Sequence, residues 1–219
     1  MTSPHLIEIP AFPHGKRIAL TTSWDDGRVY DRRVVAAFNE WGLKGTFNLN
    51  SGKLTDTGKP APAESEGHLD KSEIAALYAG HEVAIHTVTH PHLPRLDPVQ
   101  IAQEVLEDRK ALEDLVGYPV RGMAYPYGTY SPRVIEVLRA LGIVYCRTVE
   151  NRSPCFPPAE ALAWPATCHK FAQTPEPLPQ RFENFYGNRG SNGQVFFVWG
   201  HSYEFAPARW AELESLFKP

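Results

Sequence analysis

Acidic and histidine side chains follow several apolar stretches of this sequence, in types and spacings that suit metal-assisted hydrolysis. Asp25 and Asp26 follow one stretch, His86 and His90 close another, and His201 closes a third. Two imidazoles and one carboxylate can bind a divalent cation and leave positions open for water and substrate. The second carboxylate could then accept a proton from water, so we expect one Asp to bind the cation and its neighbour to act as a base.

The spacing of the two histidines supports this expectation. On a helical turn, residues four apart share one face, so His86 and His90 could point at the same ion. Taken alone, a histidine is usually a core or surface residue, and Asp-Asp-Gly is a common turn sequence. The occurrence of both features after apolar stretches favours a metal site over these simpler interpretations.

The elements that would position these residues alternate between β-rich runs and helical patterns. We predict strands at 17–22, 45–50, 82–86, 122–125, 143–148 and 195–199, with a weaker one at 162–165. Alternation of strands and helices favours a parallel sheet, and catalytic groups in α/β barrels follow the C-terminal ends of the strands. We therefore expect a single domain over residues 1–219 that forms a small or incomplete (β/α) barrel.

Several predicted helices have recognisable ends. Asp97 and Ser131 are placed to cap two of them, and Asp70 with Glu73 resembles a capping box. A helix closed by Gly42 and a last helix at 207–217 complete the set. The proline-rich stretch 154–179 is predicted to be a long irregular loop, of the kind that often lines a functional site.

The composition argues against some classes of binding partner. With 42% hydrophobic and 21% charged residues, the chain is typical of a globular protein. A net charge of -3 without a Lys/Arg cluster argues against nucleic acid, and no apolar run approaches the ~20 residues of a membrane span. The N-terminus lacks a signal peptide's basic start and apolar stretch, so we expect a cytoplasmic protein. Three cysteines without C-x-x-C spacing argue against a cysteine zinc site, and the oligomeric state stays open.

Four motifs together resemble a known family. They are Ser-Trp-Asp-Asp-Gly at 23–27, His-Thr-Val-Thr-His at 86–90, Tyr-Pro-Tyr-Gly at 125–128, and His201. In this order they resemble the polysaccharide deacetylases, also called the NodB-homology domain or carbohydrate esterase family 4. The resemblance implies a distorted (β/α)7 barrel that removes acetyl groups from an N-acetylated amino sugar or polysaccharide.

The resemblance also implies roles for individual residues. Asp26, His86 and His90 would bind a divalent metal, usually zinc, for which cobalt or nickel can substitute. Asp25 would be the general base and His201 the general acid. The backbone N–H of Tyr127 would help to stabilise the oxyanion.

Two features depart from the family pattern. The family usually has an Arg where this chain has Ala124, and Arg121 is a possible replacement, although on a strand it would face the opposite side. An acidic element that tunes the acid is also not evident. Glu204 could orient His201, and His169 lies in roughly the right region, although a structural role is favoured for it.

Other functions stay open at this point. A sugar O-acetyl esterase or a cyclic-amide hydrolase could use the same barrel. A non-haem iron oxygenase uses the same ligand types, but the β/α alternation and the histidine spacing argue against it. A degenerate domain that binds glycans without turnover is the non-enzymatic alternative.

Overall fold

The computed structural model describes residues 12, 16, 18–62, 65–151, 156–170, 178–187, 194–205 and 209–218. Its strands are β1 (Ile18–Asp25), β2 (Thr46–Leu49), β3 (Glu82–Ile85), β4 (Gly122–Ala124), β5 (Tyr145–Asn151), β6 (Trp164–Ala166), β7 (Cys168–His169) and β8 (Gln194–His201). Its α-helices are α1 (Asp31–Trp41), α2 (Ile74–Leu77), α3 (Pro98–Val116), α4 (Pro132–Ala140), α5 (Leu178–Gly187) and α6 (Trp210–Phe217). Short 3-10 helices are η2 (Lys71–Glu73), η3 (Leu93–Arg95), η4 (Pro126–Gly128), η5 (Ala161–Ala163) and η6 (Ser202–Phe205).

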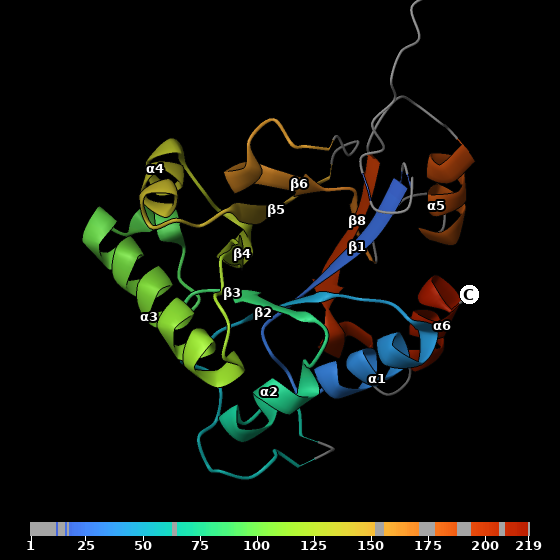
Figure 1. Ribbon diagram of the computed structural model, residues 1–219, viewed down its shortest axis with the longest axis horizontal. Helices are drawn as coiled ribbons and strands as arrows, with labels where there is room; N and C mark the ends of the chain where they lie inside the picture. The colour runs from blue at the N-terminus through green and yellow to red at the C-terminus, as the bar shows by residue number, and fades with distance from the viewer. Residues whose placement is uncertain are drawn as a thin grey trace, which may run out of the picture.

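The strands form one parallel sheet that curls into a nearly closed barrel (Figure 1), as the resemblance predicted. Their order is β6-β5-β4-β3-β2-β1-β8-β7, so β6 and β7 end the order, yet Thr167 alone separates them in sequence. Thr167 donates its N–H to the Phe197 carbonyl, and its Oγ1 accepts from the Phe197 N–H, both at 2.8 Å. One extended segment thus pairs with β5 and then with β8, so the eight strands occupy seven positions around the barrel.

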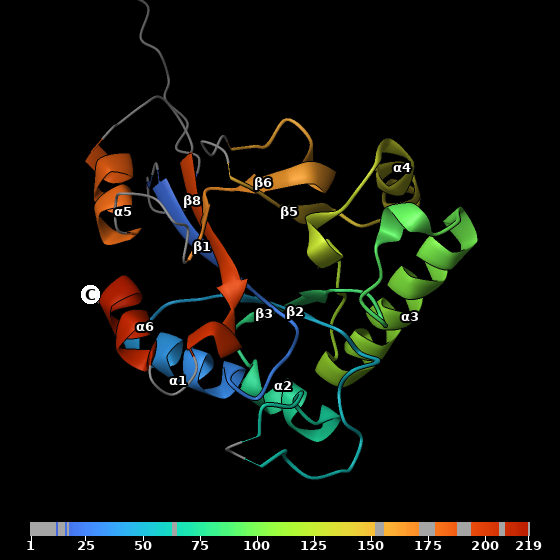
Figure 2. The ribbon, with the colours of Figure 1, turned by 180° about the vertical axis from the view of Figure 1, so that it is seen from behind.

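Helices surround this sheet in both views (Figures 1 and 2). Helices α3 and α4 lie together on one side, and α1 and α6 lie together on the other. Trp24 of β1 packs outward against Phe38 of α1 and Phe217 of α6, with ring centroids 5.9 and 6.1 Å apart. Because neighbouring strand residues face opposite sides, Ser23 and Asp25 face the barrel interior.

The helix ends follow the sequence signals closely. Asp97 forms a capping box with Gln100 at the start of α3, and Gly117 ends that helix in the left-handed conformation. Ser131 accepts from the Val134 N–H at the start of α4. The capping box at Asp70 opens η2, which leads directly into α2.

The predicted loop at 154–179 is wrong as an irregular segment. Its described parts contain η5, β6 and β7, and α5 begins at Leu178, a helix that we did not predict. The weaker strand predicted at 162–165 overlaps β6, whereas β7 was not predicted. Two residues that pair with a distant strand are too few to show an alternating pattern. Residues 152–155 and 171–177 of that stretch, including Cys155, lie outside the described residues.

Candidate active site

Asp26, His86 and His90 come together at the C-terminal ends of β1 and β3, as predicted. Oδ1 of Asp26 lies 3.8 Å from Nε2 of His86 and 3.7 Å from Nε2 of His90. All three atoms lie within 4.8 Å of one another. A single ion between them could therefore contact one oxygen and two nitrogens.

The backbone between His86 and His90 does not form the expected helical turn. Residues 86–90 form no helix, and instead Thr87 and His90 adopt positive φ angles of 68° and 64°. Asp26 and Tyr127 are also left-handed, at 83° and 57°. Such angles strain residues other than glycine, and they tend to gather at functional sites. These four are the non-glycine residues with positive φ in the described part of the chain, and they belong to three of the four motifs.

The donor atoms suit a divalent cation. His86 donates from Nδ1 to the Ala124 carbonyl at 2.8 Å, which leaves the lone pair on Nε2 facing Asp26. Burial lowers the pKa of His86, and burial with the nearby His86 charge lowers the pKa of His90 to about 4. Both rings are therefore neutral at pH 7, the form that binds metals. Oδ1 of Asp26 is buried without a hydrogen-bond partner among the described residues, so a bound cation would satisfy it.

Asp25 lies beside this cluster, on the interior side of β1. Arg147 of β5 donates from Nη2 to both of its carboxylate oxygens at 2.5 Å, and Asn48 donates to Oδ1 at 2.8 Å. Burial on its own would raise the pKa of Asp25, but the Arg147 charge and its hydrogen bonds outweigh it, with help from His86. The pKa is lowered, so the carboxylate is ionised at neutral pH and can accept a proton.

Arg147 is the residue that sequence reasoning missed, and Arg121 was the wrong candidate. Arg121 is exposed, as its place on the opposite side of the strand implied, whereas the Arg147 side chain is fully buried. Arg147 pairs with Ala124 in the β4–β5 register, so it enters the barrel beside the position where the family has its Arg. The available signal was a single Arg in the otherwise uncharged predicted strand 143–148, since a charge that a strand carries into the core requires a partner.

His201 and Glu204 lie together at the end of β8. His201 pairs with Asp25 in the β1–β8 register, which places the predicted acid beside the predicted base. The His201 backbone N–H donates to Glu204 Oε2 at 2.9 Å, and Nδ1 of its ring lies 3.5 Å from Oε1. Burial opposes a charged imidazole, but Glu204 and Asp25 outweigh it and raise the pKa of His201.

His169 and Lys170 complete the surroundings of Glu204. Nε2 of His169 lies 3.3 Å from Glu204 Oε1, and Nζ of Lys170 lies 3.3 Å from Oε2. Gly200 leaves space for the Lys170 stem, because a Cβ at Gly200 would meet Lys170 Cδ at 2.7 Å. His169 therefore contacts the partner of the predicted acid and not the metal cluster.

Tyr127 forms an exposed edge of the site. Its ring stacks on His92 at 4.0 Å between centroids, its edge-on contact with His90 is 4.4 Å, and 57% of the residue is exposed. Its backbone N–H donates to no described residue in the chain. The N–H and the ring are thus both available to a bound molecule.

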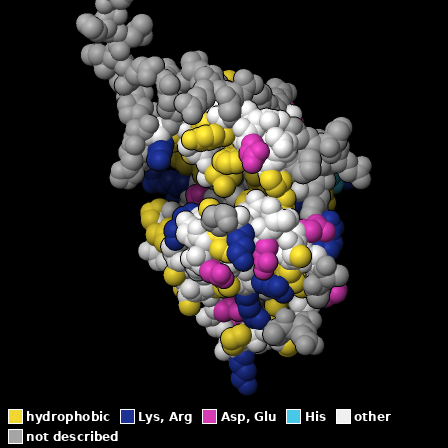
Figure 3. Space-filling view, turned by 90° about the vertical axis from the view of Figure 1, so that its right-hand side faces the viewer, with side chains coloured by type: hydrophobic (Ala, Val, Ile, Leu, Met, Phe, Trp, Pro, Cys, Tyr) yellow, Lys and Arg dark blue, Asp and Glu magenta, His cyan; other side chains and the backbone are white. Residues whose placement is uncertain are grey.

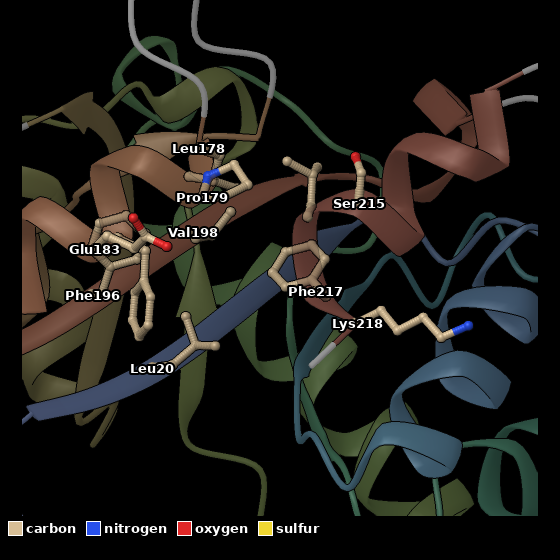
Figure 4. Close-up of a pocket in the computed structure, with 11 residues that line it drawn as sticks. Leu20, Leu178, Pro179, Glu183, Phe196, Val198, Ser215, Phe217 and Lys218 are labelled. Carbon is tan, nitrogen blue, oxygen red and sulfur yellow. The ribbon is translucent and has the colours of Figure 1, made fainter.

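A cavity of about 280 Å³ is lined by none of the site residues described above. It lies between α5, α6, β1 and β8, and its lining includes Leu20, Phe196 and Phe217 (Figure 4). Basic and acidic side chains are interspersed on the face drawn in Figure 3. Among the described helices, none has the length and apolarity that spanning a bilayer requires.

Comparison with known proteins points to one family. Residues 13–146 match the sequence profile described as polysaccharide deacetylase. The chain is 31% identical over 132 residues to the peptidoglycan-N-acetylglucosamine deacetylase PgdA of Listeria monocytogenes, which is 59% of this chain and 25% of that protein. The chain therefore spans about a quarter of the length of this curated relative.

Solved structures share the fold at low sequence identity. A candidate polysaccharide deacetylase from Mycobacterium smegmatis superposes with a TM-score of 0.67 at 16% identity, over 94% of this chain and 84% of its own. A family 4 acetyl xylan esterase from Clostridium thermocellum, solved in complex with a cobalt ion, gives 0.57 at 16% identity, over 92% and 82%. At 16% identity, these two similarities support a shared barrel fold only.

Proposed function

Because the chain belongs to the polysaccharide deacetylase family, we propose that it is a metal-dependent hydrolase that removes acetyl groups from N-acetylated amino sugars. The observation that carries the metal dependence is the buried Oδ1 of Asp26, which faces Nε2 of two neutral histidines and has no described hydrogen-bond partner. The peptidoglycan-N-acetylglucosamine deacetylase among its relatives supports the class of substrate.

Asp26, His86 and His90 would hold the cation, for which zinc is our first choice and cobalt or nickel are alternatives. Two imidazoles and one carboxylate are a ligand set of catalytic zinc sites. When bound, the cation would polarise the acetyl carbonyl and lower the pKa of water beside it.

The proton transfers fall to two residues on adjacent strands. Asp25 is ionised and held by Arg147, so it can take a proton from the attacking water. As the C–N bond breaks, the amine needs a proton, and His201 can supply it because its pKa is raised. The Tyr127 N–H can donate to the oxyanion, a contact typically worth ~3–4 kcal/mol. The products are acetate and the free amino sugar.

The test combines metal content with acetate release from oligomers of N-acetylglucosamine. We expect near one metal per wild-type chain, and loss of both metal and activity in Asp26→Ala and His86→Ala. Asp25→Asn should keep the metal and lose about 10²–10⁴-fold in rate. Asp56→Ala removes an exposed carboxylate that pairs with Lys71 and serves as the matched control.

Two results would contradict the proposal. One is a wild-type protein that binds no zinc, cobalt or nickel and releases no acetate. The other is faster release of acetate from O-acetylated xylan than from N-acetylglucosamine oligomers, which would favour the sugar O-acetyl esterase.

A further inference from the structure

Helix α3 contacts the loop that carries both histidine ligands, through two acidic side chains. Glu104 and Asp108 are four residues apart, so they share one face of the helix. That face lies against the end of β3 and residues 86–90. Neither residue belongs to the group formed by Asp26, His86 and His90, so both are outside the proposed ligand set.

Asp108 binds the backbone at the start of this loop. It is fully buried, and its Oδ2 accepts from the His86 N–H at 3.0 Å, a donor that also lies 3.0 Å from the Leu49 carbonyl. Its Oδ1 accepts from the Ser51 N–H at 2.7 Å. One carboxylate thus joins the segments that follow β2 and β3.

Glu104 binds the same loop one turn earlier on the helix. Its Oε2 accepts from the Thr89 N–H at 2.9 Å, and its Oε1 accepts from the Thr89 hydroxyl at 2.6 Å. Its own carbonyl accepts from the Val88 N–H at 3.3 Å. Val88 and Thr89 therefore cannot shift without breaking contacts to α3.

The loop needs such contacts because its backbone is strained. Thr87 and His90 have positive φ angles, which residues other than glycine adopt only at a cost in free energy. Such a conformation persists only where its surroundings enforce it. Asn50 contributes from the β2 side, donating to the carbonyls of His86 and Thr87 at 2.5 and 2.9 Å.

We infer that Glu104 and Asp108 are positioning residues that hold the loop so that both imidazoles face Asp26, and that they thereby set the affinity for the cation. The inference rests on the proposed function, since it concerns the same metal cluster. Residues that orient metal ligands typically change metal affinity 10–100-fold when they are replaced. Glu104 and Asp108 contact the backbone of the loop and not the imidazole rings of His86 and His90.

The experiment measures the zinc dissociation constant by competition with a chromogenic chelator. Asp108→Asn exchanges one of two oxygens that accept from N–H groups for an amide that cannot accept. Glu104→Met removes both acceptors, because a Gln could still accept from the Thr89 N–H and donate to its hydroxyl. We expect each to weaken zinc binding about tenfold or more. Glu107→Met, on the exposed face of the same helix, should bind zinc as the wild type does.

Thermal melting with and without zinc separates positioning from a general structural role. Positioning predicts that the zinc-induced rise in Tm shrinks in both variants, because weaker binding stabilises less. A merely structural role would lower the Tm of the zinc-free protein and leave the zinc-induced rise unchanged, which would overturn the inference. If Asp108→Asn does not fold, Glu104→Met at its less buried position carries the test.

The zinc-binding measurements distinguish failure of this inference from failure of the proposed function. Tight zinc binding by the wild type with equal affinity in both variants would overturn the inference and leave the proposed function intact. A wild type that binds neither zinc nor another divalent cation would overturn both.

Discussion

At the scale of single residues, the Asp25–Arg147 pair is the feature that most affects both stability and chemistry. The two side chains are 4% and 0% exposed, so each charge depends on the other for compensation. Arg147 also donates from Nε to Ser23 at 3.2 Å and lies over the Trp199 ring at 4.7 Å. The pair therefore holds the predicted base inside the barrel, next to the histidines of the site.

Arg147→Met should be strongly destabilising, because it leaves the Asp25 charge buried without a partner. Breaking one side of such a pair typically costs about 3–5 kcal/mol of unfolding free energy. The double variant Asp25→Asn/Arg147→Met should recover part of that loss, since the orphaned charge is gone. Denaturant unfolding of the wild type and both variants measures this, and equal costs in the single and double variants would contradict it.

Glu204 should determine the alkaline limit of activity through His201. Its carboxylate raises the pKa of His201, so the protonated acid persists to higher pH than an ordinary histidine would allow. Glu204→Gln keeps an oxygen for the His201 N–H but removes the charge. The alkaline limb of the kcat/KM profile should then move to lower pH, so that the activity at pH 8 falls below that of the wild type. An unmoved limb would show that Glu204 does not tune the acid.

At the scale of elements, the start of α1 depends on one buried carboxyl group. Asp31 is completely buried, and Tyr78 at the end of α2 donates to its Oδ2 at 2.5 Å. Burial raises the pKa of Asp31 to about 7, against the hydrogen bonds that favour its ionised form. The two helices are thus joined by a carboxyl group that resists ionisation in the folded protein.

This raised pKa predicts a pH-dependent stability. The unfolded chain releases the Asp31 proton near pH 4, whereas the folded chain holds it until about pH 7, so stability falls as pH rises between these values. Asp31→Asn should remove this dependence and exceed wild-type stability by at least about 1 kcal/mol at pH 8. Urea unfolding at pH 5 and pH 8 checks it. A variant less stable than wild type at both values would mean that the lost hydrogen bonds dominate.

At the scale of the whole molecule, the barrel depends on one short segment for closure. Trp164–Ala166 and Cys168–His169 pair with strands on opposite sides, and Thr167 makes two hydrogen bonds to Phe197 between them. The interior cluster around Ala166, Val195 and Phe197 is covered by this segment. Closure therefore protects both the apolar interior and the buried Arg147.

Thr167→Val tests this closure with a nearly isosteric change. The Phe197 N–H would lose its acceptor in a buried place, at a cost of about 1–3 kcal/mol of unfolding free energy. Thr21→Val, on β1, is the matched control because its hydroxyl bonds to no described residue. Similar stability for the two variants in denaturant unfolding would mean that the Thr167 hydroxyl contributes nothing to closure.

The sequence alone was sufficient for the features that depend on local chemistry. Alternating strands and helices predicted the barrel, and the caps at Asp97 and Ser131 marked helix starts. Such patterns can be read from a sequence because each one involves only residues that are close together in the chain. Reading only the residues after each strand placed Asp25, Asp26, His86 and His90 at one rim. The family resemblance then selected Asp26 as the ligand, and its carboxylate lies beside both histidines in the structure.

The tertiary structure decided what depends on contacts between distant residues. Ser23 and Arg147 are 124 positions apart, and only the β4–β5 register brings the guanidinium beside Ala124 and against the base. The left-handed conformation of Thr87 and His90 likewise follows from contacts with α3 and β2, not from the spacing of the histidines. Strand register and long-range hydrogen bonds leave no periodic trace in a sequence, and for that physical reason these features became visible only in the fold.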